Sequence, residues 1–367
     1  MSYKTTIETP ELSRAFKKTT NSYKLFWVYA LLSLVNRTSR NSFTLDEIIC
    51  EMVVLAWHPV CFYRLTFGIQ DKLQDIIIKI QKTSTLQSNS SSDEIRDYIN
   101  SSSDIQNDLL IFSRYVPTRF LTPWFENELQ GIPDARRTNR IKELSIQSQN
   151  LSAPCPYFFD EKGNSRRIHL NSSWHGFFLK NMGVSLSFVK YHLSSFLQRR
   201  NPNVPGIINK MQAPSKRNLT IARNFWNTVK ERFITCSKNN QFIDIYSNNP
   251  IEHNFSIDHF LPWSFVTHDL LWNLVPVEYS TNSQKGNALP DLDIYLPRMA
   301  NLHRDAISAL KDKPRFMEDF ANGFKQDIFS LMSQKDKGLL TKYRELILPL
   351  YQIAKNIGFE DSWVLSD

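Results

Sequence analysis

The order of short apolar runs in residues 255–290 restricts the local fold of this chain more than any other feature. These residues read FSIDHFLPWSFVTHDLLWNLVPVEYSTNSQKGNALP. Two short β-type runs, each closed by a proline that prevents further extension, are followed by a short polar stretch that is predicted to be helical. The first run ends at Asp258-His259, and the helix carries Asn282. Strand, loop, strand and helix in this order let Asp258 and Asn282 converge on one point.

The residue types at this point suit the metal-assisted hydrolysis of a phosphodiester bond. A neutral imidazole, with an ordinary pKa of about 6.5, takes a proton from water near neutral pH, and we interpret His259 as the general base. Hard divalent cations prefer oxygen ligands. We therefore expect Asp258 and Asn282 to bind Mg²⁺, with Mn²⁺ as an alternative ion. Asn273 is expected to hold the second ring nitrogen of His259 and to fix its tautomer.

This pattern resembles the ββα-metal, or His-Me finger, fold of HNH endonucleases. The resemblance covers residues 242–290 and rests on Asp-His, a central Asn before an apolar pair, and N-x-x-K on a helix. It is similar to the HNH domain of CRISPR effector nucleases, in which Asn likewise replaces the last His. The resemblance implies that His259 is the base, that Asn273 orients it, and that Lys285 faces phosphate. It also implies products with 5′-phosphate and 3′-hydroxyl ends.

A finer resemblance concerns larger prokaryotic HNH proteins. The phrases RNPNVP at 200–205 and IDHFLPWSF at 257–265 are similar to theirs. Many of these proteins belong to antiphage defence operons, among them the nuclease component of Zorya systems. The resemblance implies defence against foreign DNA, with other proteins of the operon contacting the N-terminal helical domain. The chain departs from zinc-binding relatives because its four cysteines, at 50, 61, 155 and 236, form no CxxC pair.

Positive charge is concentrated in residues 190–240. The whole chain carries +8, and this segment contains ten basic residues and one acidic residue. Such a segment is typical of a polyanion-binding surface, although a solvated helix face is the alternative. Four of its residues flank a connector rich in Pro and Gly and are expected to contact DNA phosphates: Arg199, Arg200, Lys216 and Arg217.

Hydrophobic residues make up 41% of the chain and aromatic residues 13%, which is enough for packed cores. Periodicity predicts a mainly α protein with a small ββα-metal module, hence α+β overall. We expect a helical N-terminal domain at 1–150 with a Ser-rich loop at 83–104, a hairpin and basic helical segment at 151–240, the nuclease module at 241–295, and a helical tail at 296–367. No run approaches the ~18 apolar residues of a membrane span, and we expect a soluble cytoplasmic protein.

Two other functions stay open at this stage. One is a non-catalytic nucleic-acid-binding protein with a decayed HNH fold, although every residue of the motif is present. The other is an RNA-cleaving, toxin-type nuclease, because such a metal site does not read the sugar. The choice between a nick and a double-strand cut also stays open. The loop pair His268-Asp269 is interpreted as an ordinary loop pair, with substrate contact as the alternative.

Overall fold

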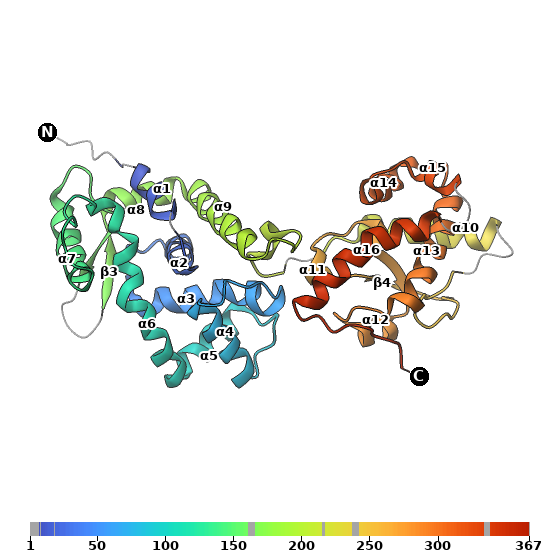
Figure 1. Cartoon of the computed structure of the whole chain (residues 1–367), viewed down its shortest axis with the longest axis horizontal. Coiled ribbons are helices and arrows are strands. Elements are labelled where there is room, and N and C mark those ends of the chain that lie inside the picture. Colours follow the sequence, from blue (N-terminus) through green and yellow to red (C-terminus); the bar gives the residue numbers. More distant parts are fainter. Residues whose placement is uncertain are drawn as a thin grey trace. The chain divides into compact units, whose positions relative to one another are not determined.

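A computed structural model describes the chain in two compact units. The described residues are 7, 9–17, 19–160, 166–214, 217–236, 242–333 and 338–366. The N-terminal unit consists of Met1–Pro202 and Ile207–Pro214, and the C-terminal unit of Asn203–Gly206 and Ser215–Asp367 (Figure 1). The structure is mainly helical with two small antiparallel sheets, which confirms the expected α+β class. Among the helices described, none is both long enough and apolar enough to cross a membrane.

The N-terminal unit surrounds a small antiparallel sheet with helices. Its strands are β1 (Ser42–Thr44), β2 (Tyr157–Asp160) and β3 (Arg167–Leu170), in the order β1-β3-β2. Its α-helices are α1 (Thr9–Lys17), α2 (Tyr23–Thr38), α3 (Leu45–Trp57), α4 (Lys72–Thr83), α5 (Ser92–Ser101), α6 (Ser103–Phe120), α7 (Asp134–Gln147), α8 (Ser172–Lys180) and α9 (Met182–Arg200). Short π and 3-10 turns are η1 (His58–Phe62), η2 (Thr122–Phe125), η3 (Ser148–Asn150) and η4 (Ile207–Lys210).

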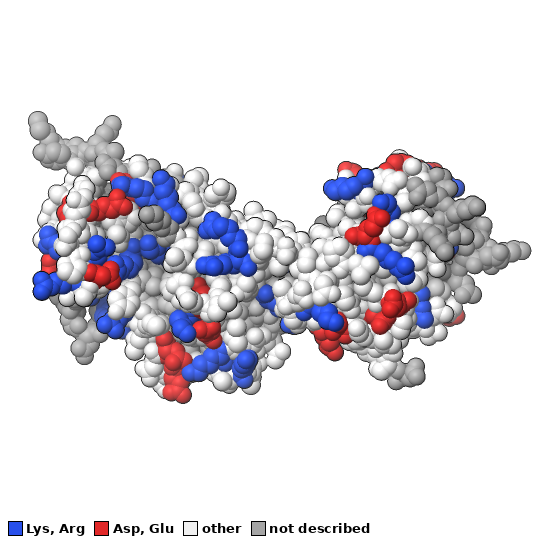
Figure 2. All heavy atoms as spheres, viewed as in Figure 1, with Lys and Arg blue, Asp and Glu red and all other residues white. Residues whose placement is uncertain are grey.

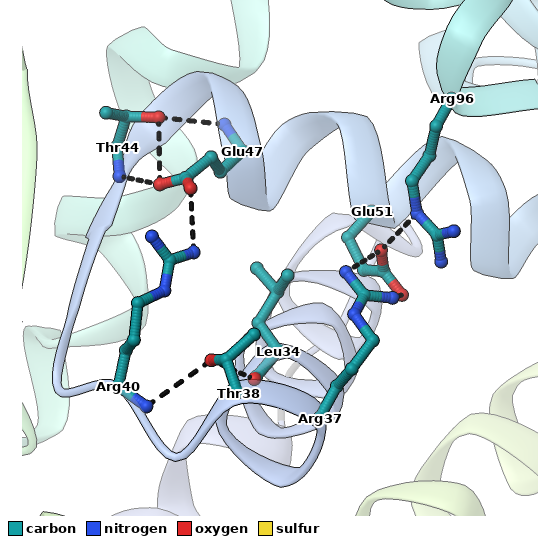
Figure 3. Close-up of polar contacts among 8 residues, drawn as sticks. All are labelled: Leu34, Arg37, Thr38, Arg40, Thr44, Glu47, Glu51 and Arg96. Atoms are coloured by element: carbon teal, nitrogen blue, oxygen red, sulfur yellow. Dashed lines mark hydrogen bonds and ion pairs between the residues drawn. The ribbon is translucent and has the colours of Figure 1, made fainter. Parts of the chain in front are cut away.

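A buried carboxylate joins three helices of this unit. Glu51 of α3 is only 4% exposed, and its Oε2 accepts hydrogen bonds from Arg37 of α2 at 3.2 Å and from Arg96 of α5 at 3.1 Å (Figure 3). The two guanidinium groups offset the cost of removing the carboxylate from water. At the start of α3, Thr44 and Glu47 form a capping box, also drawn in Figure 3.

The predicted Ser-rich loop at 83–104 is wrong over most of its length. Helix α5 occupies Ser92–Ser101, and α6 begins at Ser103. The physical reason is a second capping box: Ser91 accepts from the backbone of Glu94, whose side chain accepts from the backbone of Ser91 at 2.7 Å. Ile95 and Ile99, one turn apart, are buried and supply the apolar face. The serine content of the segment favoured a loop, whereas the spacing S-x-x-E indicates the start of a helix.

The C-terminal unit contains a two-stranded sheet enclosed by helices. Strand β4 (Ser256–His259) pairs antiparallel with β5 (Leu274–Val277), with Asp258 opposite Val275 and His259 opposite Leu274. The helices are α10 (Thr220–Cys236), α11 (Trp263–Val266), α12 (Tyr279–Lys285), α13 (Leu292–Ala309), α14 (Glu318–Phe324), α15 (Ile328–Ser333) and α16 (Gly338–Asn356), with 3-10 turns η5 (Leu271–Asn273) and η6 (Pro314–Phe316).

One hydrophobic core runs through this unit. Trp226 of α10, Val275 of β5, Met299 of α13 and Tyr343 of α16 all belong to it, and each is almost fully buried. Helices α13 and α16 pack side by side (Figure 1). The strand–strand–helix segment is therefore packed against helices that precede and follow it in the sequence. Those helices supply the burial that a segment of its size cannot supply alone.

A buried histidine ties β5 to α13 and α16. His303 of α13 is fully buried; its Nε2 lies 2.9 Å from the carbonyl of Leu274, and its Nδ1 contacts the hydroxyl of Tyr343. A carbonyl only accepts, so Nε2 carries the hydrogen and Nδ1 accepts from Tyr343. Burial lowers the pKa of His303 to about 4. The neutral ring is thus part of the packing of this unit.

We predict that mild acid destabilises the C-terminal unit through His303. Between pH 6.5 and about 4 the unfolded chain binds a proton at this ring and the folded chain does not, so the free energy of unfolding falls as the pH falls. The loss should be about 3 kcal/mol across this window. Urea denaturation of the wild type and of His303→Gln, which keeps a donor and an acceptor but does not titrate, measures it. Parallel pH profiles for the two proteins would refute the assignment.

Candidate active site

Helix α12 places Asn282 against the face of β4 that carries Asp258. Alternate residues of a strand share a face, so Ser256 and Asp258 point the same way. From α12, the amide nitrogen of Asn282 donates to Ser256 Oγ at 2.6 Å, and the ammonium of Lys285 lies 3.0 Å from Asp258 Oδ2. The structure thus brings Asp258 and Asn282 to one face, as expected. Because Ser256 engages the amide nitrogen, the amide oxygen of Asn282 is the atom suited to bind a cation.

The start of α12 is fixed by a second buried carboxylate. Asp244 is fully buried, and its Oδ2 accepts from the backbone of Glu278, the residue that caps α12, at 2.9 Å. Its Oδ1 accepts from the backbone of Tyr246 at 2.8 Å. The loop before β4 and the helix after β5 are therefore held by the same side chain. This contact determines where α12 begins relative to the strands.

Asp258 lies in a nearly dry environment with two partners. It is 5% exposed, and its Oδ2 accepts from the hydroxyl of Tyr246 at 2.8 Å. Lys285 supplies the positive charge. Burial, reinforced by the negative charge of Asp258, raises the pKa of Tyr246 well above its usual value, so the phenol stays protonated and donates. Sequence reasoning missed Tyr246, which lies 12 residues before Asp258 in a loop.

Asp269 and Arg217 hold the ring of His259 in one tautomer. The ring is 3% exposed; its Nε2 lies 2.8 Å from Asp269 Oδ1, and its Nδ1 lies 3.4 Å from Arg217 Nη1. A guanidinium only donates, so Nδ1 accepts and Nε2 carries the hydrogen that is donated to Asp269. The guanidinium of Arg217 also lies 6.0 Å from the centre of the Trp263 ring. Nδ1 therefore carries the lone pair of the ring.

Asn273 does not contact the His259 ring, which corrects the expectation from the sequence. Its side chain accepts from the backbone N–H of Leu261 and donates to the carbonyl of the same residue, both at 2.9 Å. Its own carbonyl accepts from the backbone of Phe260 at 2.8 Å. Asn273 thus fixes the backbone that follows His259. Asp269, interpreted from the sequence as part of an ordinary loop pair, fixes the tautomer instead.

The loop that carries Asp269 is braced by α14. The backbone N–H of Leu271 donates to Asp319 Oδ2 at 3.1 Å. Gly323 of α14 lies directly against Trp272, and a Cβ at this glycine would come within 2.7 Å of the indole. Only glycine allows this approach without a shift of the ring. The helix therefore holds the loop that presents Asp269 to His259.

Lys285 differs from its expected role as a phosphate-facing residue. It is 2% exposed, and its ammonium donates to the carbonyl of His259 at 2.8 Å as well as contacting Asp258. A side chain buried in this way cannot reach a phosphate at the surface. Lys285 is instead the internal counter-charge of Asp258.

The expected basic surface is divided between the two units. Arg199 and Arg200 end α9 in the N-terminal unit, where Arg200 donates to the carbonyl of Thr20 at 2.7 Å. Lys216 lies outside the described residues. Lys210 is fully buried, and burial lowers its pKa to about 7, so it is no part of a solvated surface. On the face drawn in Figure 2, basic and acidic side chains are intermixed on each unit.

Comparison with known proteins assigns one segment of the chain. Residues 244–291 match the family described as HNH endonuclease, so the C-terminal unit contains an HNH domain. The matched segment includes the five motif residues singled out from the sequence, namely Asp258, His259, Asn273, Asn282 and Lys285. No curated protein and no solved structure matches the chain.

We predict that the buried pair of Lys285 and Asp258 is a major source of stability. Removing one partner leaves an uncompensated buried charge, so Lys285→Met should lower the free energy of unfolding by about 3–5 kcal/mol. Asp258→Asn combined with Lys285→Met should cost less than the sum of the single changes. Urea denaturation in the presence of EDTA measures both effects.

The control is Lys342→Met, which removes an exposed ion pair with Glu345 in the same unit. It should cost less than about 1 kcal/mol. An equal cost for Lys285→Met and Lys342→Met would mean that the buried pair does not hold α12 to β4.

Proposed function

We propose that this chain is a metal-dependent HNH endonuclease that hydrolyses phosphodiester bonds in DNA. The observation that carries the proposal is the contact of His259 Nε2 with Asp269 at 2.8 Å, inside the segment that matches HNH endonucleases. This contact fixes the orientation of the ring and leaves the lone pair of Nδ1 to accept a proton. Asp258 of β4 and Asn282 of α12 lie where these two elements pack against each other. A base and a set of oxygen ligands on neighbouring elements are what the reaction requires.

His259 would take the proton of the attacking water at Nδ1. The positive charge that develops on the ring is then stabilised by Asp269 through the hydrogen on Nε2, as in other acid–histidine pairs. Arg217, beside Nδ1, presents a planar guanidinium that suits a phosphate. On substrate binding we expect Arg217 to turn from the ring to the scissile phosphate. This movement would release Nδ1 and place the phosphorus next to it.

The donor set fits a hard divalent cation. Asp258 and Asn282 offer a carboxylate and an amide oxygen, whereas no group of three or more His, Cys, Asp or Glu side chains among the described residues could hold a metal ion. Mg²⁺ commonly uses one or two carboxylates together with water and substrate phosphate. Asp258 and Asn282 would thus hold Mg²⁺, or Mn²⁺ in its place, jointly with DNA. The ion supplies charge to stabilise the leaving oxygen.

We further propose a place for this activity in prokaryotic defence against foreign DNA, in the cytoplasm. The support is the similarity of residues 200–205 and 257–265 to larger HNH proteins of defence operons, including the Zorya nuclease component. In this proposal the N-terminal unit contacts partner proteins. Arg199, Arg200 and Lys216 contribute phosphate contacts that position DNA without reading its sequence.

We predict that His259→Ala abolishes nicking of supercoiled plasmid while DNA affinity is retained. Loss of the general base should lower the single-turnover rate in Mg²⁺ by roughly 10²–10⁴-fold. The control is His253→Ala, an exposed histidine in the loop before β4, which should cleave at the wild-type rate. EDTA should stop the wild type.

Wild-type nicking by a folded His259→Ala protein, or nicking that persists in excess EDTA, would refute the mechanism. A parallel reaction with single-stranded RNA of the same sequence distinguishes the substrate. Faster cleavage of the RNA would replace DNA by RNA in the proposal.

Asp269 should affect turnover and leave DNA binding unchanged. Asp269→Ala frees the ring of His259 to rotate and removes its counter-charge, so the single-turnover rate should fall by roughly 10- to 10³-fold with little change in Kd. Asp269→Asn keeps an acceptor without the charge, so its single-turnover rate should lie between that of the wild type and that of Asp269→Ala. His268→Ala in the same loop is the control. A parallel fall in DNA affinity and melting temperature would instead indicate that Asp269 only maintains the loop.

A further inference from the structure

The N-terminal unit contains a polar cavity in a region that the proposed nuclease chemistry does not use. Its volume is about 540 Å³, within the range of small-molecule sites. Helix α6 contributes four residues between 110 and 115 to its wall, α7 contributes five residues between 134 and 142, and the β2–β3 hairpin contributes Phe159, Arg166 and Arg167. Each wall comes from a different element of the unit. The cavity is therefore a product of the tertiary fold.

Positive charge dominates the wall. Four basic side chains line the cavity, namely Arg114, Lys142, Arg166 and Arg167. The acidic residue in the lining, Asp134, is already bonded to Arg119 at 2.7 Å. Arg114, Arg166 and Arg167 give this concave wall an excess of positive charge, which attracts and retains anions.

The arginines of this wall keep donors available. Arg166 uses one nitrogen on Ser113 Oγ at 2.9 Å. Within the part of the chain that the structure describes, no carboxylate forms an ion pair with Arg114 or Arg167. Asp160, opposite Arg167 in the sheet, contacts His169 at 3.3 Å instead. A guanidinium carries five donors in a planar fork that matches phosphate.

The same cavity has an apolar and aromatic side. Tyr115 and Leu110 line it and are 43% and 44% exposed, so both side chains are accessible to a ligand. The guanidinium of Arg114 lies 5.0 Å from the centre of the Tyr115 ring. Tyrosine rings and guanidinium planes are the surfaces on which nucleobases stack. Thr138 and Asn139 add hydrogen-bonding groups to the lining.

We propose that this cavity binds one nucleotide, with its phosphates on Arg114 and Arg167 and its base against Tyr115 and Leu110. The volume suits a single nucleotide. The phosphate and base could belong to a free nucleotide or to the end of a nucleic-acid strand, since both present the same chemistry. The proposal does not depend on the nuclease assignment, because none of these residues belongs to the HNH segment.

The test is calorimetric titration of the full chain, in EDTA, with ATP, AMP and a 5′-phosphorylated single-stranded tetranucleotide. Saturable binding is expected, and Arg114→Ala/Arg167→Ala should weaken it at least about 10-fold, because each phosphate loses a charge-assisted contact. Arg167→Lys should be intermediate, since it keeps the charge and loses the fork. Tighter binding of the tetranucleotide than of AMP identifies a strand end, and the reverse a free nucleotide.

The matched control is Arg140→Ala. Arg140 lies on α7 but outside the cavity lining, and it contacts Glu143 at 2.9 Å. It should bind nucleotide as the wild type does. Absence of saturable binding up to about 1 mM overturns the proposal. So does binding that Arg114→Ala/Arg167→Ala leaves unchanged, or that Arg140→Ala weakens equally. Circular dichroism and melting temperature establish that each variant is folded, and the single change Arg167→Lys retains the test if the double variant is not.

Discussion

The ammonium of Lys285 is the contact on which the geometry of the C-terminal unit depends. It lies in a nearly dry position between the carboxylate of Asp258 and the carbonyl of His259. A charged pair of this kind is costly to bury and costly to break, so the distance between α12 and β4 has little freedom. Because Asn282 is on the same short helix as Lys285, its position relative to Asp258 follows from this one contact.

The same contact has a consequence for cation binding. Asp258 shares its negative charge with Lys285 and with the hydroxyl of Tyr246, so the two proposed protein ligands alone attract a divalent ion weakly. The missing negative charge is that of the substrate phosphate. Metal affinity and DNA affinity should therefore be thermodynamically coupled, each raising the other by the same factor. Such coupling would keep the site inactive without a bound strand.

The sequence predicted elements that local pattern determines and missed contacts that tertiary folding creates. The ββα order and the position of Asn282 on the face of β4 that carries Asp258 follow from short-range spacing, and an HNH family match covers that segment. Asp269 reaches His259 only because α14 holds the intervening loop, and α14 lies far along the chain. The burial of Lys285 likewise depends on the core around the motif. The sequence pattern alone does not distinguish an exposed from a buried lysine at position 285, one helical turn after Asn282.

The basic segment shows why composition alone is a poor guide to a binding surface. Its charges have unlike environments: Lys210 is buried, Arg200 is bonded to a backbone carbonyl, and Arg217 touches the His259 ring. Only charges that meet phosphate release counterions and contribute to salt-dependent binding. Arg217 would act on the reacting phosphate, whereas Arg199 and Arg200, on the other unit, could add only affinity. The basic residues of the segment therefore have different roles, structural, catalytic or electrostatic, and a count of charges does not distinguish them.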